Sequence, residues 1–224
     1  MNRRITGSLF VSLDGVIQAP GGPSEDPSGG FAEGGWVFKL WDEGVNRTLG
    51  ELFGGEYDLL LGRRTYDISA AYWPYVEGPE AGMGEAFTKA NKYVLTHGGA
   101  DLGWDNSHAL SGFDDIAALK QTEGPDLIVQ GSSTLYPELI AKGLIDRLTL
   151  LTYPVVLGSG KRWFGADTKV GTLKLTDHYV TDQGTVVTTY EPGGALPPYP
   201  AEAPAPSTSA REMARRARIE AGTW

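Results

Sequence analysis

Residues 126–136 read Asp-Leu-Ile-Val-Gln-Gly-Ser-Ser-Thr-Leu-Tyr, and this stretch decides the fold that we expect. Its apolar run follows Gly124-Pro125 and predicts a buried strand that turns at Gly131. Apolar residues then recur at helical spacing over 135–143, so a helix follows at once. Any of three hydroxyl residues could cap that helix, namely Ser132, Ser133 and Thr134. Free N–H groups at such a start attract phosphate, although an ordinary strand-to-helix turn shows the same pattern.

A second copy of this design lies earlier in the chain. Residues 57–62 form an apolar run that ends in Gly62, and Arg63, Arg64 and Thr65 follow directly. Arginine is the side chain best suited to paired hydrogen bonds with phosphate, although surface arginines in a loop are the simpler explanation. Two such helix starts in one domain suit an extended ligand with separated phosphates. This favours a dinucleotide that carries an extra phosphate.

The bulk composition excludes several classes of function. The chain has 224 residues, a formal net charge of −9 and no cysteine. Disulfides, thiolate catalysis and thiolate metal sites are therefore excluded. The acidic balance disfavours nucleic acids and anionic membranes as main partners. No apolar run reaches membrane-spanning length and no signal segment opens the chain, so we expect a cytoplasmic protein.

The region between the first strand and the second helix start is rich in aromatic residues. Residues 19–35 form a long Gly-, Pro- and acid-rich loop, either a lid or rim over a site or a disordered insertion. Residues 36–53 show helical periodicity, interrupted or bent near Gly44. Asp42, beside Trp41, is either a proton donor with a raised pKa or part of a solvated acidic face.

The remaining elements complete an α/β pattern. We expect strands over 4–13, 92–96 and 144–153, and a hairpin of 173–180 with 186–190. Strands alternate with helices, which predicts a three-layer α/β fold, with helices on both faces of a mostly parallel sheet and an antiparallel hairpin at the end. Residues 1–191 form one domain, and 192–224 form a Pro-rich linker and a short basic helix with a Ser209–Glu212 capping box. That helix either docks on its own domain or a second subunit, or stays solvated.

The order of these motifs resembles the dihydrofolate reductase-like superfamily, and most closely the branch shared with the reductase domain of bacterial riboflavin biosynthesis. Four segments carry the resemblance: Ser12-Leu13-Asp14-Gly15-Val16-Ile17, Leu61-Gly62-Arg63-Arg64-Thr65-Tyr66, Gln130-Gly131-Ser132-Ser133-Thr134-Leu135-Tyr136 and Gly143-Leu144-Ile145-Asp146-Arg147-Leu148. Together they cover roughly residues 3–191 and are specific in combination, since each alone is a weak motif.

The resemblance implies NADPH as cofactor and hydride transfer to a small conjugated substrate. By position, Gly131, Ser132, Ser133, Thr134 and Leu135 would cradle the pyrophosphate. Gly62, Arg63, Arg64 and Thr65 would hold the 2′-phosphate and adenosine, with Thr96 and His97 either alongside or simply turn residues. Val11 and Ile17 would line the nicotinamide. We expect Asp14, Trp41 and Tyr136 to contact substrate, and Asp42 is the nearest candidate for the catalytic acid.

Two classes of function follow from this. The first is an NADPH-dependent reductase of a pterin- or pyrimidine-like heterocycle. Dihydrofolate itself is disfavoured because Phe10-Val11-Ser12 carries no folate-specific signature. The alternative is an NADP-binding sensor or assembly module without turnover, and a third reading is a nucleoside- or pyrimidine-handling enzyme. The same branch includes dimers, so a homodimer is the expected assembly if there is one.

Overall fold

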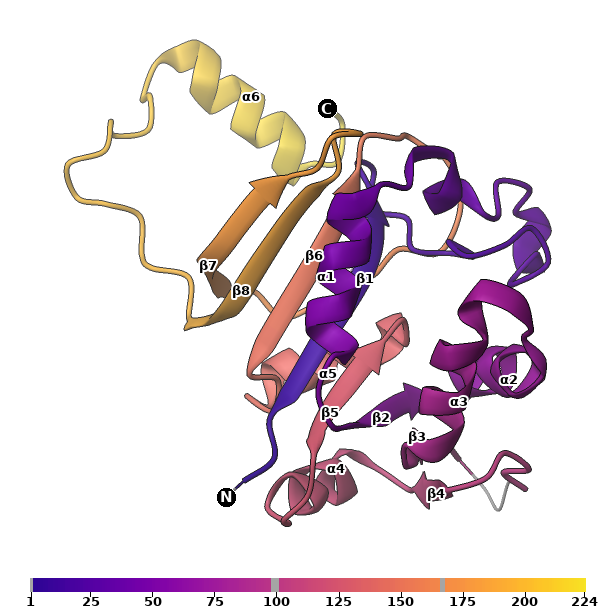
Figure 1. Ribbon diagram of the computed structural model, residues 1–224. Coiled ribbons are helices and arrows are strands. Elements are labelled where there is room, and N and C mark those ends of the chain that lie inside the picture. Colours follow the sequence, from indigo (N-terminus) through magenta and orange to yellow (C-terminus); the bar gives the residue numbers. More distant parts are fainter. Residues whose placement is uncertain (1, 98–100, 166–167) are drawn as a thin grey trace. The chain divides into compact units, whose positions relative to one another are not determined.

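The structure is a computed structural model that describes residues 2–97, 101–165 and 168–224 (Figure 1). The chain separates into two compact units, Met1–Gly194 and Ala195–Trp224. The first unit ends with the last strand of the sheet, three residues after the predicted domain boundary at residue 191. Each unit is described by itself.

The first unit is built on one sheet. The strands found in the described residues are β1 (Ile5–Ser12), β2 (Tyr57–Gly62), β3 (Lys92–Leu95), β4 (Ser107–Leu110), β5 (Asp126–Gln130), β6 (Arg147–Tyr153), β7 (Thr172–Val180) and β8 (Val186–Gly194). They pair in the order β4-β3-β2-β5-β1-β6-β8-β7. Every pair from β4 to β6 is parallel, whereas β6–β8 and β7–β8 are antiparallel. This confirms the predicted mostly parallel sheet with its closing hairpin.

Helices cover both faces of this sheet. The α-helices of the first unit are α1 (Glu43–Phe53), α2 (Arg63–Tyr72), α3 (Ala81–Lys89), α4 (Phe113–Lys120) and α5 (Tyr136–Ala141), and its short 3-10 helices are η1 (Ser28–Gly30), η2 (Trp36–Leu40), η3 (Trp73–Tyr75), η4 (Gly78–Glu80) and η5 (Ser133–Leu135). In Figure 1, α1 crosses the near face of β1 and β6. Across the described ranges, no helix is both long enough and apolar enough to span a membrane.

Alternation along the strands divides the core between the two faces. In β5, Leu127 and Val129 join the apolar cluster under α4 and α5, which also includes Ile116 and Leu139. Ile128 points the other way, into a cluster shared with α2 and α3. A third cluster packs beneath the start of α1 and the loop before it, and its buried members are Val16, Ala19, Phe31, Trp36, Val37, Val45, Leu151, Tyr153 and Val187. The fold is therefore three-layered, as predicted.

The predicted helix over 36–53 is two elements rather than one. Trp41 is extended after η2, with a ψ of 137°. Asp42 then caps α1, because its Oδ1 accepts a hydrogen bond from the Val45 N–H at 3.1 Å. The interruption thus falls at Trp41–Asp42, and Gly44 lies in the first turn of α1 rather than at a bend.

The long loop over 19–35 is fastened rather than loose. The buried Gln18 side chain donates to the carbonyls of Asp26 and Ser28 at 2.8 and 2.9 Å. Trp36 Nε1 donates to the Gln18 carbonyl at 2.9 Å, and its ring meets Tyr153 edge-on. These contacts favour the interpretation of residues 19–35 as an ordered rim over the interpretation as a disordered insertion, because hydrogen bonds hold the loop to the core at several points. We refer to residues 19–35 as the rim.

The second unit holds α6 (Ala210–Glu220). Ser209 Oγ accepts from the Glu212 N–H at 3.2 Å, which forms the first half of the predicted capping box. The Glu212 carboxylate does not reach back to the cap. It accepts hydrogen bonds from Arg215 and Arg216 instead, and these lower its pKa to about 2.

Candidate functional site

The carboxyl ends of β1, β2 and β5 meet at one edge of the sheet because these strands are parallel neighbours. The chain moves outward from β2 to β4 and then returns to insert β5 between β2 and β1. The order in which strands are added to the sheet therefore reverses between β4 and β5. In open α/β sheets, ligands bind outside the carboxyl ends of strands at such a reversal. This edge is the candidate site.

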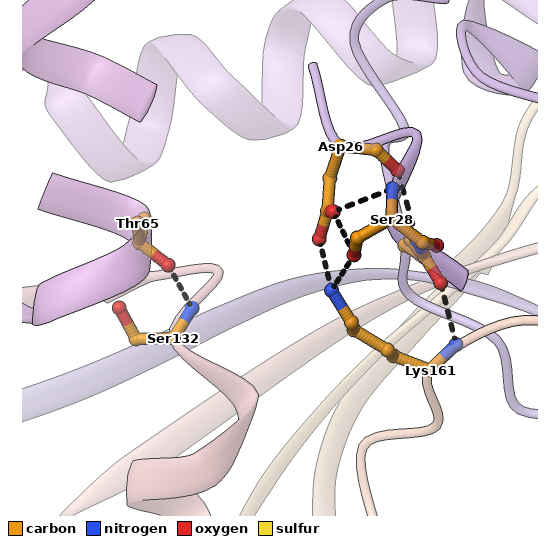
Figure 2. Close-up of polar contacts among 6 residues, drawn as sticks. Asp26, Ser28, Thr65, Ser132 and Lys161 are labelled. Atoms are coloured by element: carbon orange, nitrogen blue, oxygen red, sulfur yellow. Dashed lines mark hydrogen bonds and ion pairs between the residues drawn. The ribbon is translucent and has the colours of Figure 1, made fainter. Parts of the chain in front are cut away.

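Two strand-to-helix turns stand at this edge and are tied to each other (Figure 2). The Gly62 N–H donates to Ser132 Oγ at 2.9 Å, and the Ser132 N–H donates to Thr65 Oγ1 at 3.0 Å. The chain turns at Gly131 with a φ of 65° and at Ser132 with a φ of 51°. A left-handed serine is uncommon and marks stored strain. We refer to residues 62–65 and 131–135, joined in this way, as the paired turns.

The hydroxyl groups of the second turn do not cap the helix there as the sequence suggested. Neither η5 nor α5 has a side-chain cap in the part of the chain that the structure describes. Ser132 reaches across to Gly62 instead, and Leu135 is buried in the core. At the first turn, α2 likewise has no side-chain cap. Its first N–H groups therefore have no intrahelical or capping acceptor and can serve a bound anion.

The two arginines of the first turn differ in their engagement. Arg63 Nε contacts both carboxylate oxygens of Asp67, at 2.8 and 3.0 Å. Arg64 is exposed and forms no ion pair with any residue of the described ranges. Arg64 is thus the guanidinium that is free to take up a phosphate.

Thr96 and His97 follow β3, the next strand along this edge. Thr96 is buried and its N–H donates to the Leu110 carbonyl at 3.0 Å, so it belongs to the sheet margin. His97 is exposed. Leu95 pairs with Gly62, so Thr96 and His97, which directly follow Leu95, lie next to the first of the paired turns.

The structure contradicts the raised pKa expected for Asp42. Burial works to raise its pKa, but the hydrogen bonds that it receives outweigh burial and hold the pKa below the usual range. One oxygen caps α1, and the other accepts the Gln183 N–H at 2.7 Å. A carboxylate that is ionised and committed to two backbone donors is a poor proton donor. Asp42 is a helix cap.

Two residues that were expected to contact a ligand, Tyr136 and Val11, have buried side chains. Tyr136 has no exposed surface, and its hydroxyl accepts from the Ser8 N–H at 3.1 Å and donates to the Val129 carbonyl at 2.7 Å. Burial also raises its pKa far above the usual range. Val11 is 5% exposed in the cluster beneath α4 and α5. Neither side chain has surface left for a ring of a ligand.

Asp14 has a structural task that the sequence did not reveal. Its carboxylate accepts hydrogen bonds from Ser12 Oγ at 2.7 Å and from the N–H groups of Leu157 and Gly158 at 3.1 and 2.9 Å. The Ser12 bond first, and then these backbone donors, lower its pKa to about 2. Asp14 joins the turn after β1 to the loop after β6, so contact with a substrate would compete with these bonds.

Ile17 and Trp41 keep part of their surface exposed, so the structure is compatible with ligand contacts by both. The Trp41 ring stacks on Phe38 at 4.9 Å between centroids and lies 6.1 Å from the Phe10 ring. Its Nε1 donates to Asn46 Oδ1 at 2.8 Å. Trp41 therefore belongs to an aromatic group next to the end of β1.

The loop over 19–35 takes part in a polar cluster that was not predicted from the sequence. Lys161 Nζ pairs with the Asp26 carboxylate and donates to Ser28 Oγ at 2.6 Å, and the Lys161 N–H donates to Gln18 Oε1 at 3.0 Å (Figure 2). Burial works to raise the pKa of Asp26, but Lys161 and Ser28 outweigh it and lower that pKa. Nothing in the local pattern pairs residues more than a hundred positions apart.

The hollows found in the described residues lie away from the paired turns. Two hollows of about 430 and 500 Å³ lie along α2 and α3, and neither is lined by Gly62, Arg64 or Ser132. In the described parts of the chain, His, Asp and Glu side chains form no group of three able to hold a metal ion. At the paired turns, the uncapped start of α2 and the exposed Arg64 guanidinium are the groups able to meet an anion.

Part of the chain matches a known protein family. Residues 114–187, which include β5, the second of the paired turns and β6, match the family described as the RibD C-terminal domain. The uncharacterized protein YyaP of Bacillus subtilis (strain 168) is 27% identical over 197 residues, which is 86% of this chain and 96% of that protein.

Three solved structures share the fold. A structure described as a riboflavin biosynthesis protein from Shewanella sp. PV-4 has a TM-score of 0.62 at 18% identity, covering 86% of this chain and 99% of that one. Dihydrofolate reductase from Enterococcus faecalis, complexed with NADP(H) and RAB-propyl, has a TM-score of 0.54 at 15% identity over 86% and 99%. A pyrimidine reductase-like protein from Corynebacterium diphtheriae has a TM-score of 0.52 at 14% identity over 85% and 92%. These findings confirm the predicted resemblance.

Proposed function

We propose that this chain, which resembles the riboflavin-biosynthesis reductase branch of the dihydrofolate reductase-like superfamily, is an NADPH-dependent reductase that transfers hydride to a small pterin- or pyrimidine-like heterocycle other than dihydrofolate. The observation that carries the proposal is the pair of turns, fastened to each other by two hydrogen bonds at the strand-order reversal. A clamp of two uncapped helix starts suits a ligand whose phosphates are separated.

The division of labour follows from the contacts. The turn over 131–135 would hold the pyrophosphate, since its backbone is fixed from the side by Thr65. Arg64 would take the 2′-phosphate, because its guanidinium is exposed and has no carboxylate partner among the described residues. Charge-assisted, two-pronged contacts of this kind are the ones that discriminate NADPH from NADH.

Neither Asp42 nor Asp14 is well suited to protonate a substrate. Asp42 and Asp14 are both ionised and both committed to backbone donors. Glu25 in the rim differs, because burial raises its pKa even though the Gly21 N–H donates to it at 2.6 Å. Because Glu25 also lies in the loop that follows β1, we propose it as the group to test for proton delivery.

The commitment of Asp42 and Asp14 also supports the second candidate, a cofactor-binding sensor without turnover. One experiment distinguishes the two candidates. The absorbance of NADPH is followed over time in the presence of the protein and each member of a panel of pterins, pyrimidinones and quinones. A reductase consumes NADPH with at least one pterin or pyrimidinone, and the Glu25→Gln variant slows that reaction without changing the affinity for NADPH. Tight NADPH binding with no consumption across the panel would leave the sensor as the function.

A further inference from the structure

The Ser132 hydroxyl accepts a hydrogen bond at the start of a helix to which it does not belong. Its Oγ accepts the N–H of Gly62 at 2.9 Å, and Gly62 is the residue that directly precedes the first turn of α2. In a capping box, a side chain from the first turn of the same helix accepts this N–H. Here the acceptor comes from the other turn, 70 residues further along the chain.

The backbone of Ser132 is strained in the conformation from which this bond is made. Its φ is 51° and its ψ is 43°, in the left-handed region that residues other than glycine rarely adopt. Residues in this region persist only where the surrounding structure holds them, and they gather at ligand clamps and switch regions. Two hydrogen bonds to the first turn hold Ser132, the bond from Gly62 and the bond from its own N–H to Thr65 Oγ1 (Figure 2).

This helix start is also where the proposed function places a phosphate. The N–H groups in the first turn of α2 have no side-chain cap, so they can meet an anion. A Cβ atom at Gly62 would lie 3.8 Å from both Ser132 Oγ and Thr134 Oγ1, so hydroxyls of the second turn line the space beside Gly62. A phosphate that binds here therefore meets one backbone donor, the Gly62 N–H, that a hydroxyl of the chain already occupies.

We propose that the Ser132 hydroxyl is a built-in competitor of the phosphate, which displaces it from the Gly62 N–H when NADPH binds. The proposal rests on the proposed function and describes what sets the affinity of that same site. A phosphate oxygen accepts a charge-assisted hydrogen bond, which is roughly twice as strong as the neutral bond that a hydroxyl accepts. The exchange is therefore favourable, but the affinity is lower than it would be if the Gly62 N–H had no partner in the chain. The bond from the Ser132 N–H to Thr65 takes no part in the exchange and keeps the turns together.

A competitor and a positioning group predict opposite results when the hydroxyl is removed. Removal of a hydroxyl that positions the turn for the cofactor weakens NADPH binding, whereas removal of a competitor strengthens it. Ser132→Gly is the first variant, because glycine adopts a positive φ without strain and the turn keeps its backbone conformation. Ser132→Ala is the second, because it removes the same hydroxyl and keeps a side chain at this position.

The affinity for NADPH is measured by calorimetry on the full-length protein, in the wild type and in the Ser132→Gly, Ser132→Ala and Thr48→Val variants. Thr48→Val is the matched control, because the buried Thr48 also has a hydrogen-bonded hydroxyl, which donates to the Gly44 carbonyl at 2.9 Å, but it lies on α1, outside the paired turns. Urea denaturation of each variant confirms folding. The second measurement is hydrogen exchange of the Gly62 amide, followed by NMR on protein with labelled glycine nitrogens, with and without NADPH.

We expect both Ser132 variants to bind NADPH at least about threefold more tightly than the wild type, since a neutral hydrogen bond is worth about a factor of 2–13 in an equilibrium constant. Thr48→Val should bind NADPH with wild-type affinity. Without NADPH, the Gly62 amide should exchange faster in both Ser132 variants than in the wild type. On addition of NADPH this exchange should slow, because the phosphate takes the place of the hydroxyl.

Unchanged or weaker NADPH binding in the Ser132 variants overturns the proposal. A Gly62 amide that still exchanges rapidly in their NADPH complexes overturns it as well. In both cases, NADPH binding by the wild type leaves the proposed function standing. Failure of NADPH to bind to the wild type and to every variant overturns the proposed function, and this proposal with it.

Discussion

The hydrogen bonds between the paired turns allow a quantitative prediction about Ser132. Its Oγ accepts the buried Gly62 N–H, and its own N–H is accepted by Thr65. Ser132→Ala removes the first bond and leaves a buried donor unpaired, which costs about 1–3 kcal/mol. The left-handed φ of 51° persists in this variant, and alanine tolerates it no better than serine does.

Ser132→Gly separates the two effects. It loses the same hydrogen bond, but glycine adopts a positive φ without the penalty of about 1–2 kcal/mol that other residues pay there. The lost bond and the released strain then largely offset each other, apart from the small entropic cost of glycine in the unfolded chain. Ser132→Gly should therefore be more stable than Ser132→Ala by about 1 kcal/mol. Thr65→Val, which removes the acceptor of the Ser132 N–H, should again cost about 1–3 kcal/mol.

The assay is urea denaturation followed by tryptophan fluorescence, with Thr122→Val as control. The Thr122 hydroxyl donates to the Leu119 carbonyl on the surface, so its loss should change stability by less than about 0.5 kcal/mol. In a domain of this size each 1 kcal/mol shifts the melting temperature by about 2–4 °C. Equal stabilities for Ser132→Ala and Ser132→Gly, or a Thr65→Val variant as stable as the control, would refute this description of the turns.

Three other predictions concern the frame around the site. Asp58→Asn breaks the buried ion pair with Arg3 and should cost about 3–5 kcal/mol in urea denaturation, since an unpaired charge stays buried. Asp14 has a pKa of about 2 in the folded protein against a usual 3.8, so its contribution to the stability of the fold is complete above pH 3.8 and is lost as the pH falls toward 2. Asp14→Asn should therefore make the melting temperature fall less steeply between pH 3.8 and 2. An unchanged slope would show that the Asp14 carboxylate does not stabilise the fold. Lys161→Met removes the ion pair with Asp26 that holds the loop over 19–35, so a protease should cleave this loop faster than in the wild type. Unchanged cleavage kinetics would show that Lys161 does not hold the loop in place.

The elements were predictable because their signals are local. The apolar runs before Gly62 and Gly131 mark β2 and β5, and the helical spacing after each marks the crossover that makes the sheet parallel. The hairpin of β7 and β8 follows from its glycine turn in the same way. What failed was the reading of individual side chains, whose partners lie far away in the sequence.

Two examples show the physical reason. The donor that fixes Asp42 as an ionised cap is the N–H of Gln183, 141 residues away, and no local pattern announces it. Tyr136 follows the second of the paired turns and was expected to contact substrate, but its hydroxyl hydrogen-bonds to Ser8 on β1 and the side chain is fully buried. The hydrogen-bond partners and the burial of a side chain depend on tertiary structure, whereas hydrophobic periodicity and turn residues can be read from the local sequence.

The central claim is that the paired turns form a clamp for NADPH, and the most direct test is its affinity relative to NADH in the wild type and in Arg64→Ala. We expect the wild type to prefer NADPH. Arg64→Ala should weaken NADPH by about 1–3 kcal/mol, the loss of a charge-assisted hydrogen bond, and leave NADH unchanged. Arg211→Ala, in the second unit, should alter neither. Equal affinities in the wild type, or a loss of the same size for both nucleotides in Arg64→Ala, would contradict the claim.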